Sequence, residues 1–327
     1  MYPRLAADRL HDAARRFPAV VILGARQVGK TTLARSAFPD LPYVDCQDPT
    51  VVRGAAESLA GRAVVIELAP LAACEAAAGN PPVDWRMLWL KGGFPDALRG
   101  DYREWWEAYL RLFLERDLPQ YGVAADPVLA RRLLTMLAHQ QGGILNASQL
   151  GGSLGVSYHT VQRYLAVFEQ TFIVRSLPPY FRNVGKRLVK APKVYLRDTG
   201  LLHHLLDIST HDALLSHPVR GASWETFVIE DILRREAFAH PGSQAYFWRT
   251  AAGAEVDLVI ERGARRFAVE VKTARGDHPR IARTLESALA DLDAERGWIV
   301  DQAEGIDRLG PRIARGGFEA LREGTPG

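Results

Sequence analysis

Eight consecutive residues near the start of the chain have the types and spacing that hold a phosphate group. The pattern G-x-x-x-x-G-K-[ST] is matched at every position by Gly24, Ala25, Arg26, Gln27, Val28, Gly29, Lys30 and Thr31. Glycines let backbone N–H groups curl round a phosphate, and a following helix points its positive end at the same charge. Lys30 is expected to reach the β- and γ-phosphates, and the Thr31 hydroxyl to hold Mg²⁺. The sequence therefore predicts an ATP site at residues 24–31, with Thr32 beside it.

A second group of reactive side chains lies in the last third of the chain. Residues 255–260 and 267–272 flank a turn and are expected to form a hairpin. A turn centred near Gly263 and Ala264 places Asp257 opposite Glu270, and alternation puts Lys272 on the same face. The other, buried face is expected to carry the apolar residues Val256, Leu258, Ile260, Phe267, Val269 and Val271.

Two acids and a lysine in this arrangement are typical of a PD-(D/E)XK nuclease. Asp257 and Glu270 are expected to hold Mg²⁺, whose charge polarises the scissile phosphate, and Lys272 to position or deprotonate the attacking water. Glu225, near the start of the preceding helix, matches an acid that many such sites add. Two acids directly opposite each other destabilise a hairpin unless a cation lies between them, which favours a metal site over a surface ion-pair cluster. Metal binding without cleavage stays open.

A third set of residues has the pattern of a DNA-binding surface. Residues 147–154 and 157–170 have the spacing of a helix-turn-helix, with Val161, Leu165 and Phe168 facing inward. Base edges or phosphates are within reach of the outward side chains Tyr158, His159, Gln162 and Arg163. The extended segments 172–177 and 193–196 are expected to form a wing, with its phosphate contacts at Lys186, Arg187 and Lys190. A protein-docking module is the alternative reading of the same pattern.

The elements expected to position these residues make up an α/β multidomain protein. Helices are expected at residues 5–16, from near 30, within 85–121, at 126–141, 147–154 and 157–170, from 223, and at 280–296. Strands are expected at 19–23, 42–45, 63–66, 172–177, 193–196, 244–249, 255–261, 266–272 and 297–300. The aromatic stripe of residues 105–114 is expected to be core. The domains are an abbreviated P-loop unit (1–80), a helical lid or linker (81–125), a winged helix (126–206) and a nuclease-like α/β domain (207–327).

Composition excludes several classes of protein. At 327 residues the chain exceeds the ~250 residues at which one core stops growing. It has no apolar run near the ~20 residues of a membrane span and no secretory leader, so a cytoplasmic protein without membrane contact is expected. Cys46 and Cys74 lack disulfide or zinc spacing. The net charge of +3 conceals a local basic excess between Arg182 and Lys193.

Several motifs in the same order resemble a prokaryotic family of AAA-type ATP-binding proteins fused to a C-terminal domain of unknown function. Besides the phosphate loop, the motifs are Leu59-Ala60-Gly61-Arg62-Ala63, Gly92-Gly93-Phe94-Pro95, Leu177-Pro178-Pro179-Tyr180 and Asp198-Thr199-Gly200-Leu201. The resemblance runs over most of the chain and implies ATP and Mg²⁺ as cofactors. Rings are common among AAA-type proteins, so an oligomer stays open.

This chain departs from that family in one respect that bears on catalysis. The family has a strand ending in Asp-Glu and a Thr-Gly-Ser strand before the Leu-Ala-Gly-Arg motif, and both are missing here. Glu67 matches a later strand, so the acid that holds magnesium for hydrolysis is absent. We therefore expect nucleotide binding to be weakened and ATP hydrolysis to be slow or absent. The alternatives are a nucleotide-sensing DNA-binding or adaptor module without catalysis, and a decayed ATPase.

Overall fold

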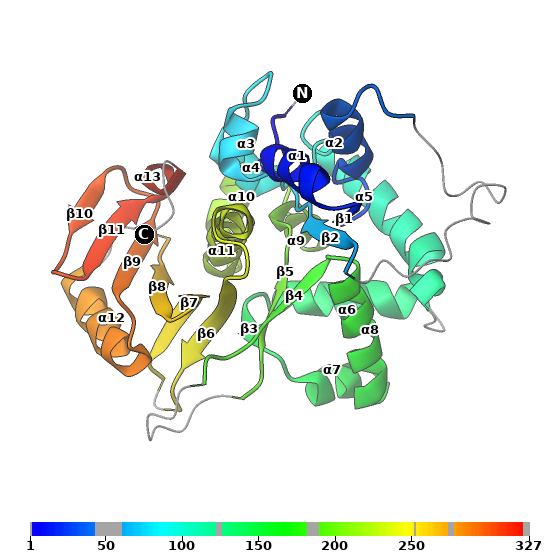
Figure 1. The fold of residues 1–327 in the computed structure, drawn as a ribbon. Coiled ribbons are helices and arrows are strands. Elements are labelled where there is room, and N and C mark those ends of the chain that lie inside the picture. Colours follow the sequence, from blue (N-terminus) through cyan, green and yellow to red (C-terminus); the bar gives the residue numbers. More distant parts are fainter. Residues whose placement is uncertain are drawn as a thin grey trace.

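The computed structural model describes residues 2–42, 61–121, 126–181, 190–251, 253–273 and 278–322. Within these ranges the strands form three separate sheets, joined by helices into a mixed α/β protein (Figure 1). The strand predicted at 42–45 lies beyond residue 42, outside the described residues, and so do Lys186 and Arg187. No helix in the described ranges is both long enough and apolar enough to cross a bilayer.

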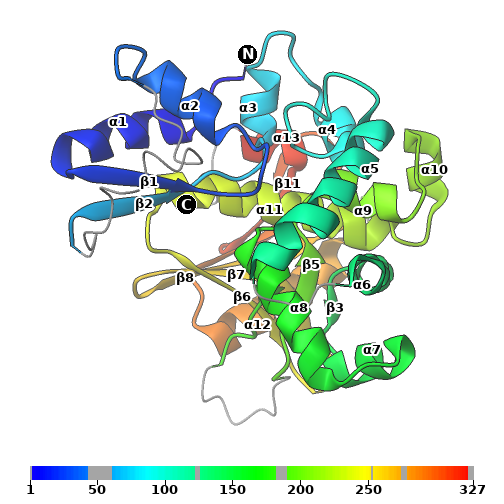
Figure 2. The ribbon, with the colours of Figure 1, turned by 90° about the vertical axis from the view of Figure 1, so that its right-hand side faces the viewer.

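The phosphate loop lies in a small parallel unit at the N-terminal end. Helix α1 (Ala6–Arg16) packs on strands β1 (Ala19–Leu23) and β2 (Ala63–Glu67), which pair in register from Ala19 and Ala63 to Leu23 and Glu67. Helix α2 (Lys30–Ala37) follows the loop, so the predicted strand, loop and helix are confirmed (Figure 2). In the described part of the chain β1 pairs with β2 alone. Both strands therefore remain partly exposed, and Val65 keeps 52% of its surface accessible.

A run of short helices connects this unit to the rest of the molecule: α3 (Ala73–Ala77), α4 (Trp85–Lys91), α5 (Tyr102–Leu112), the π-helical turn η2 (Phe113–Asp117) and the 3₁₀ turn η3 (Leu118–Tyr121). The aromatic stripe is core, as predicted. Trp106, Tyr109 and Phe113 are buried, and the Trp106 ring lies 5.0 Å from that of Phe94. Edge-to-face aromatic pairs of this kind stabilise a core beyond the area that they bury.

The helix-turn-helix region contains three helices and a small antiparallel sheet. The helices are α6 (Pro127–His139), α7 (Ala147–Leu154) and α8 (Tyr158–Gln170), and the sheet has the order β3 (Gly143–Ile144), β5 (Lys193–Leu196), β4 (Val174–Leu177). Asp126, Asn146 and Ser157 each cap the following helix through a side chain that accepts a backbone N–H. Gly155 ends α7 with a φ of 70°, which glycine adopts without strain. These local signals explain why the helix boundaries are readable from sequence.

The C-terminal region is a sheet between two helices. Strands β6 (Gln244–Arg249), β7 (Glu255–Arg262), β8 (Arg265–Val271), β9 (Arg296–Asp301), β11 (Ile313–Gly317) and β10 (Ile306–Arg308) lie side by side in this order. Helix α11 (Arg220–Ala239) covers the face turned to the rest of the molecule, and α12 (His278–Leu292) covers the outer face (Figure 1). The short helices α9 (Thr199–Leu205) and α10 (His211–Ser216) precede α11, and α13 (Phe318–Arg322) follows β11.

One expectation about this sheet is wrong. Alternation along β7 and β8 predicted a single buried face, but both faces are buried, because Val259 and Ala268 pack with Leu285 of α12. Val256 belongs to this same cluster, whereas Leu258 packs on the α11 side. Val256 and Leu258 lie on different faces because of a register shift between β6 and β7. There, two residues of β7 lie opposite one residue of β6, and such a bulge re-aims side chains.

The apolar core consists of clusters, each of which joins segments that are far apart in the chain. One cluster joins Leu10 of α1 and Leu33 of α2 to Trp106 of α5 and Leu165 of α8. A second joins Trp89 of α4 to Trp224 of α11 and to the inner face of the six-stranded sheet. This packing can hold charged side chains from distant parts of the sequence at fixed positions relative to each other.

Candidate functional site

The phosphate loop has the backbone conformation that its glycines allow. Gly24, Gln27 and Gly29 have φ angles of 150°, 59° and 98°, and Gly29 is the residue before α2. A Cβ on Gly24 would lie 2.2 Å from the Leu68 carbonyl oxygen, so only glycine fits there. Thr31 and Thr32 are exposed in the first turn of α2. The predicted loop is thus a turn between β1 and the N-terminus of a helix.

Lys30 lies folded over its own loop. Its Nζ donates to the carbonyl oxygens of Gly24, at 2.9 Å, and Ala25, at 2.7 Å. Burial and the positive charge of Arg26 lower the pKa of Lys30. Both acceptors are neutral, and a phosphate oxygen forms a stronger, charge-assisted hydrogen bond than a carbonyl does. A bound polyphosphate can therefore recruit the Lys30 ammonium at small cost.

A cavity of about 620 Å³ opens beside the loop. The lining comes from Gly24, Arg26 and Lys30 of the loop and from residues of α5, η2, η3 and the end of α8. Among the latter group and the residues after α8 are Tyr109, Phe113, Arg116, Asp117 and Phe172. The nearly buried Asp117 forms an ion pair with Arg26. Sequence reasoning missed Asp117, since nothing in its neighbourhood along the chain connects it with the loop.

Arg4 holds the loop from the other side. Its guanidinium donates to the Val28 carbonyl oxygen at 2.9 Å and to the Ala69 carbonyl oxygen at 2.5 Å, and it pairs with Glu75 at 3.2 Å. The Leu5 backbone N–H donates to the same carboxylate. The chain segment before α1 thereby connects the loop to Ala69, just after β2, and to Glu75. This contact was also missed, because Arg4 carries no recognisable motif.

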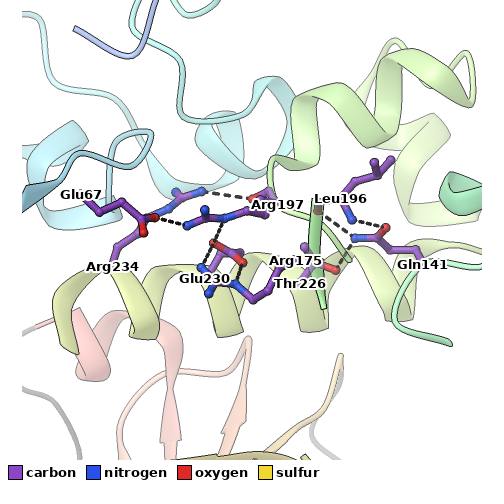
Figure 3. A network of polar contacts seen from close by, with 8 residues as sticks. All are labelled: Glu67, Gln141, Arg175, Leu196, Arg197, Thr226, Glu230 and Arg234. Carbon is purple, nitrogen blue, oxygen red and sulfur yellow. Dashed lines mark hydrogen bonds and ion pairs between the residues drawn. The ribbon is translucent and has the colours of Figure 1, made fainter. Parts of the chain in front are cut away.

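Glu67, the strand-end acid considered for magnesium, is engaged in an ion pair. It ends β2 beside Leu23, and its Oε1 lies 2.6 Å from an Arg197 nitrogen. Arg197 also contacts Glu230 of α11, which in turn pairs with Arg175 of β4 (Figure 3). Burial opposes the charge of Glu230, yet Arg175 and Arg197 hold its pKa at about 2. This network, buried at Glu230 and Arg197, ties β2, β4, α11 and the residue after β5 together.

The acid hairpin has the predicted register. Strands β7 and β8 pair from Leu258 and Val269 to Arg262 and Arg265, the register expected for a turn centred near Gly263 and Ala264, and Asp257 and Glu270 adjoin the first of these pairs. The Lys272 ammonium donates to Glu270 Oε1 at 2.5 Å, and Asp257 Oδ2 accepts the Val271 backbone N–H at 2.8 Å. Burial and Asp257 raise the pKa of Glu270 to about 8. The geometry brings together the two acids and the lysine singled out from sequence.

A residue that sequence reasoning placed beside the wing lies inside this acid cluster. Lys193, the first residue of β5, is 3% exposed, and its Nζ lies 2.6 Å from Glu255, 3.0 Å from Glu225 and 3.6 Å from Asp257. Burial opposes its charge, but the three carboxylates raise its pKa. Burial and Asp257 raise the pKa of Glu225 to about 7. Glu225 therefore joins the cluster as predicted, but it contacts an ammonium group.

The arrangement of these acids does not fit a divalent ion as it stands. Among the described residues, no three histidine, cysteine or acidic side chains are grouped so that they could ligate one metal. The space between Glu225, Glu255 and Asp257 holds the Lys193 ammonium. Mg²⁺ requires near-octahedral oxygen ligands at ~2.1 Å, so it cannot share that space with an ammonium group.

The outward face of the second helix of the helix-turn-helix is open to solvent. Tyr158, His159 and Arg163 are exposed and Gln162 is half-exposed, while Val161, Leu165 and Phe168 are buried, as predicted. Lys190, beyond the residues that are not described, is exposed. The orientation of α8 predicted from its apolar spacing is confirmed.

Two family models match this chain, and both describe domains of unknown function. Residues 83–212 match DUF8612, and residues 220–314 match DUF4143. The first match spans the helices from α4 to η3 together with the helix-turn-helix region, and the second spans α11, most of the six-stranded sheet and α12.

Relatives are found among uncharacterized mycobacterial proteins. One is from Mycobacterium tuberculosis and one from Mycobacterium bovis, each 36% identical over 363 residues, covering 92% of this chain and 80% of the relative. Those 363 aligned positions exceed the 327 residues of this chain, so the relatives have residues within the matched stretch that this chain lacks. At this identity and coverage, the chain belongs to the same family as these two uncharacterized mycobacterial proteins.

Proposed function

We propose that this chain is a cytoplasmic protein that binds ATP with Mg²⁺ at its phosphate loop. The observation that carries the proposal is the position of Lys30. Among the described residues, its ammonium donates to carbonyl oxygens of its own loop, at the edge of a cavity of about 620 Å³. Helix α2 begins at the loop, so its N-terminal dipole favours an anion at the same place. Lys30 would contact the β- and γ-phosphates, and Thr31 would hold Mg²⁺.

Hydrolysis is expected to be slow or absent. Glu67 is already paired with Arg197, and the carboxylate that lines the cavity, Asp117, is paired with Arg26. A magnesium-holding acid at the end of a neighbouring strand is needed for efficient phosphoryl transfer. ATP would then act as a bound effector, and its hydrolysis would not drive a reaction.

Thermal unfolding with and without ATP and Mg²⁺ tests this proposal. A ligand that binds the folded state at ~100 times its Kd adds ~2.7 kcal/mol of stability, which raises the melting temperature by several degrees. We expect this rise in the parent, its loss in Lys30→Ala, and its retention in Arg15→Ala, which removes an exposed cation from α1. An equal rise in the parent and in Lys30→Ala would show that ATP binds elsewhere.

We also propose that the exposed face of α8 contacts DNA. The support is the open array of Tyr158, His159, Gln162 and Arg163, with Lys190 and, outside the described residues, Lys186 and Arg187 on the connecting segment. Binding of a labelled duplex, measured by fluorescence anisotropy at several salt concentrations, should weaken as salt rises. Arg163→Ala should weaken it and reduce the salt dependence by about one phosphate contact. Retention of full affinity would favour the adaptor alternative, in which this face docks a protein.

Metal-dependent cleavage of a phosphodiester is a second candidate function. The observation in its favour is the hairpin that brings Asp257 and Lys272 near Glu270. A divalent ion bound by Asp257 and Glu270 would polarise the scissile phosphate. Lys272 would orient the attacking water, and Glu225 would supply a further carboxylate. Incubation of supercoiled DNA with Mg²⁺ or Mn²⁺ tests this, and the same rate of nicking by the parent and by Asp257→Asn would reject it.

A further inference from the structure

Lys193 reaches the acid cluster from a different part of the molecule. It begins β5, the central strand of the small three-stranded sheet, whereas Glu255 and Asp257 belong to β7 of the six-stranded sheet and Glu225 to α11. The Lys193 ammonium lies 5.8 Å above the ring of Phe247 in β6. The hydroxyl of Tyr195, on the same strand as Lys193, donates to Glu225 at 2.7 Å. Side chains of β5 thus enter the cluster at two points.

The Lys193 ammonium lies beside Asp257, one of the two acids expected to hold a divalent ion. Lys193 contacts Glu225 and Asp257, two of the acids expected around a divalent ion, and its closest contact is with Glu255. Positive charges repel strongly in a buried site, where the effective dielectric constant is lower than in water. A divalent ion and a buried ammonium group therefore exclude each other from one set of carboxylates.

The register shift in the sheet explains why Asp257 is available to Lys193. Asp257 and Leu258 of β7 lie opposite the single residue Phe247 of β6, and a bulge of this kind turns the side chain of the extra residue. One Asp257 oxygen then accepts the Val271 backbone N–H, and the other lies 3.6 Å from Lys193. The backbone at this bulge thereby turns the Asp257 side chain toward Lys193 of β5.

We propose that Lys193 is a built-in cation that closes the cluster of Glu225, Glu255 and Asp257 to divalent metal. The inference rests on the second candidate function above and is independent of ATP binding.

Calorimetric titration with Mn²⁺ tests the inference without any assay of cleavage. The key variant is Lys193→Ala combined with Glu255→Gln, which removes one positive and one negative charge and leaves Glu225, Asp257 and Glu270 in place. Its matched control is Glu255→Gln alone, in which the ammonium remains. The single variant Lys193→Ala is titrated as well, and circular dichroism confirms that each variant is folded.

The double variant should bind Mn²⁺ at least about tenfold more tightly than the parent and than Glu255→Gln alone, which corresponds to roughly 1.4 kcal/mol. The gain should disappear when Asp257→Asn is added. Methylammonium chloride should compete with Mn²⁺ in the double variant, because it refills the place of the missing side chain. A tetraalkylammonium chloride should not compete, because its cation is too large for the site.

The outcomes separate the two proposals. Equal Mn²⁺ affinity in the parent, the control and the double variant would refute the role of Lys193 while leaving the metal site intact. An absence of Mn²⁺ binding in every folded variant would refute the metal site, and with it the role of Lys193. The ATP-dependent rise in melting temperature, measured on the same samples, is expected to persist in either case.

Discussion

Two lysines, one in each candidate site, are held by opposite kinds of partner. Lys30 donates to two neutral carbonyl oxygens of its own loop, and burial lowers its pKa. Lys193 is surrounded by three carboxylates from two other elements, and their charges raise its pKa. The first lysine is therefore ready for an anionic ligand, whereas the second already has its counter-charges. The loop around Lys30 and the buried ion cluster around Lys193 thus differ in how much free energy a ligand must supply to recruit or displace the ammonium.

The largest effect is expected from the loss of the Lys193 charge. Lys193→Met keeps the length of the side chain but leaves three carboxylates without their cation, which costs ~3–5 kcal/mol for a buried pair. Urea unfolding at pH 7 measures the loss, with the exposed Lys190→Met as a control that should change stability by less than ~0.5 kcal/mol. A loss below ~1 kcal/mol would mean that the cluster is solvated and that the comparison of the two lysines is mistaken.

A smaller effect is expected at the phosphate loop, from its backbone. Gly24→Ala places a Cβ 2.2 Å from the Leu68 carbonyl oxygen at a φ of 150°, which should cost about 2–3 kcal/mol and displace the loop from α2. The ATP-dependent rise in melting temperature should be lost as well. Gly152→Ala, where no atom lies within 4 Å of the new Cβ in α7, should stabilise slightly. If Gly24→Ala kept the ATP-dependent rise in melting temperature, the conformation of the loop would not depend on this contact.

The acid cluster should also give the stability curve a slope with pH. Burial and Asp257 raise the pKa of Glu270 to about 8, above the value near 4.5 of an unfolded chain. A group raised in this way stabilises the folded state below pH ~4.5, and that stability is lost as the pH rises through ~8. Glu270→Gln cannot ionise, so its loss of stability between pH 5 and pH 8 should be smaller by at least ~1 kcal/mol. The exposed Glu304→Gln should follow the parent curve, and identical slopes in parent and Glu270→Gln would contradict the prediction.

The smallest effect on stability is expected from Lys30 itself. In Lys30→Ala the two carbonyl oxygens can bond to water in the open cavity, so the free energy of unfolding without ligand should change by less than ~1 kcal/mol. Urea unfolding in the absence of nucleotide measures it beside Lys193→Met. A loss as large as that of Lys193→Met would mean that Lys30 has a structural role that neutral acceptors do not explain.

Much of the local structure was readable from sequence. The strand, loop and helix around Gly24, the two helices after Asn146 and Ser157, and the register of the β7–β8 hairpin were all predicted. Each depends on signals that act over a few residues: glycine conformations, side-chain caps and alternation along a strand. The buried second face of the hairpin was not predicted, because α12 covers it from outside the hairpin.

The sequence by itself determined which residues could hold a phosphate or a metal and on which elements they lie. Only the tertiary structure decided their partners: Asp117 paired with Arg26, Arg197 between Glu67 and Glu230, and Lys193 among the acids. Caps and alternation are set by neighbours along the chain, whereas these ion pairs join elements that meet only when the core is packed. Charge neutralisation in a buried site is therefore a property of the whole fold.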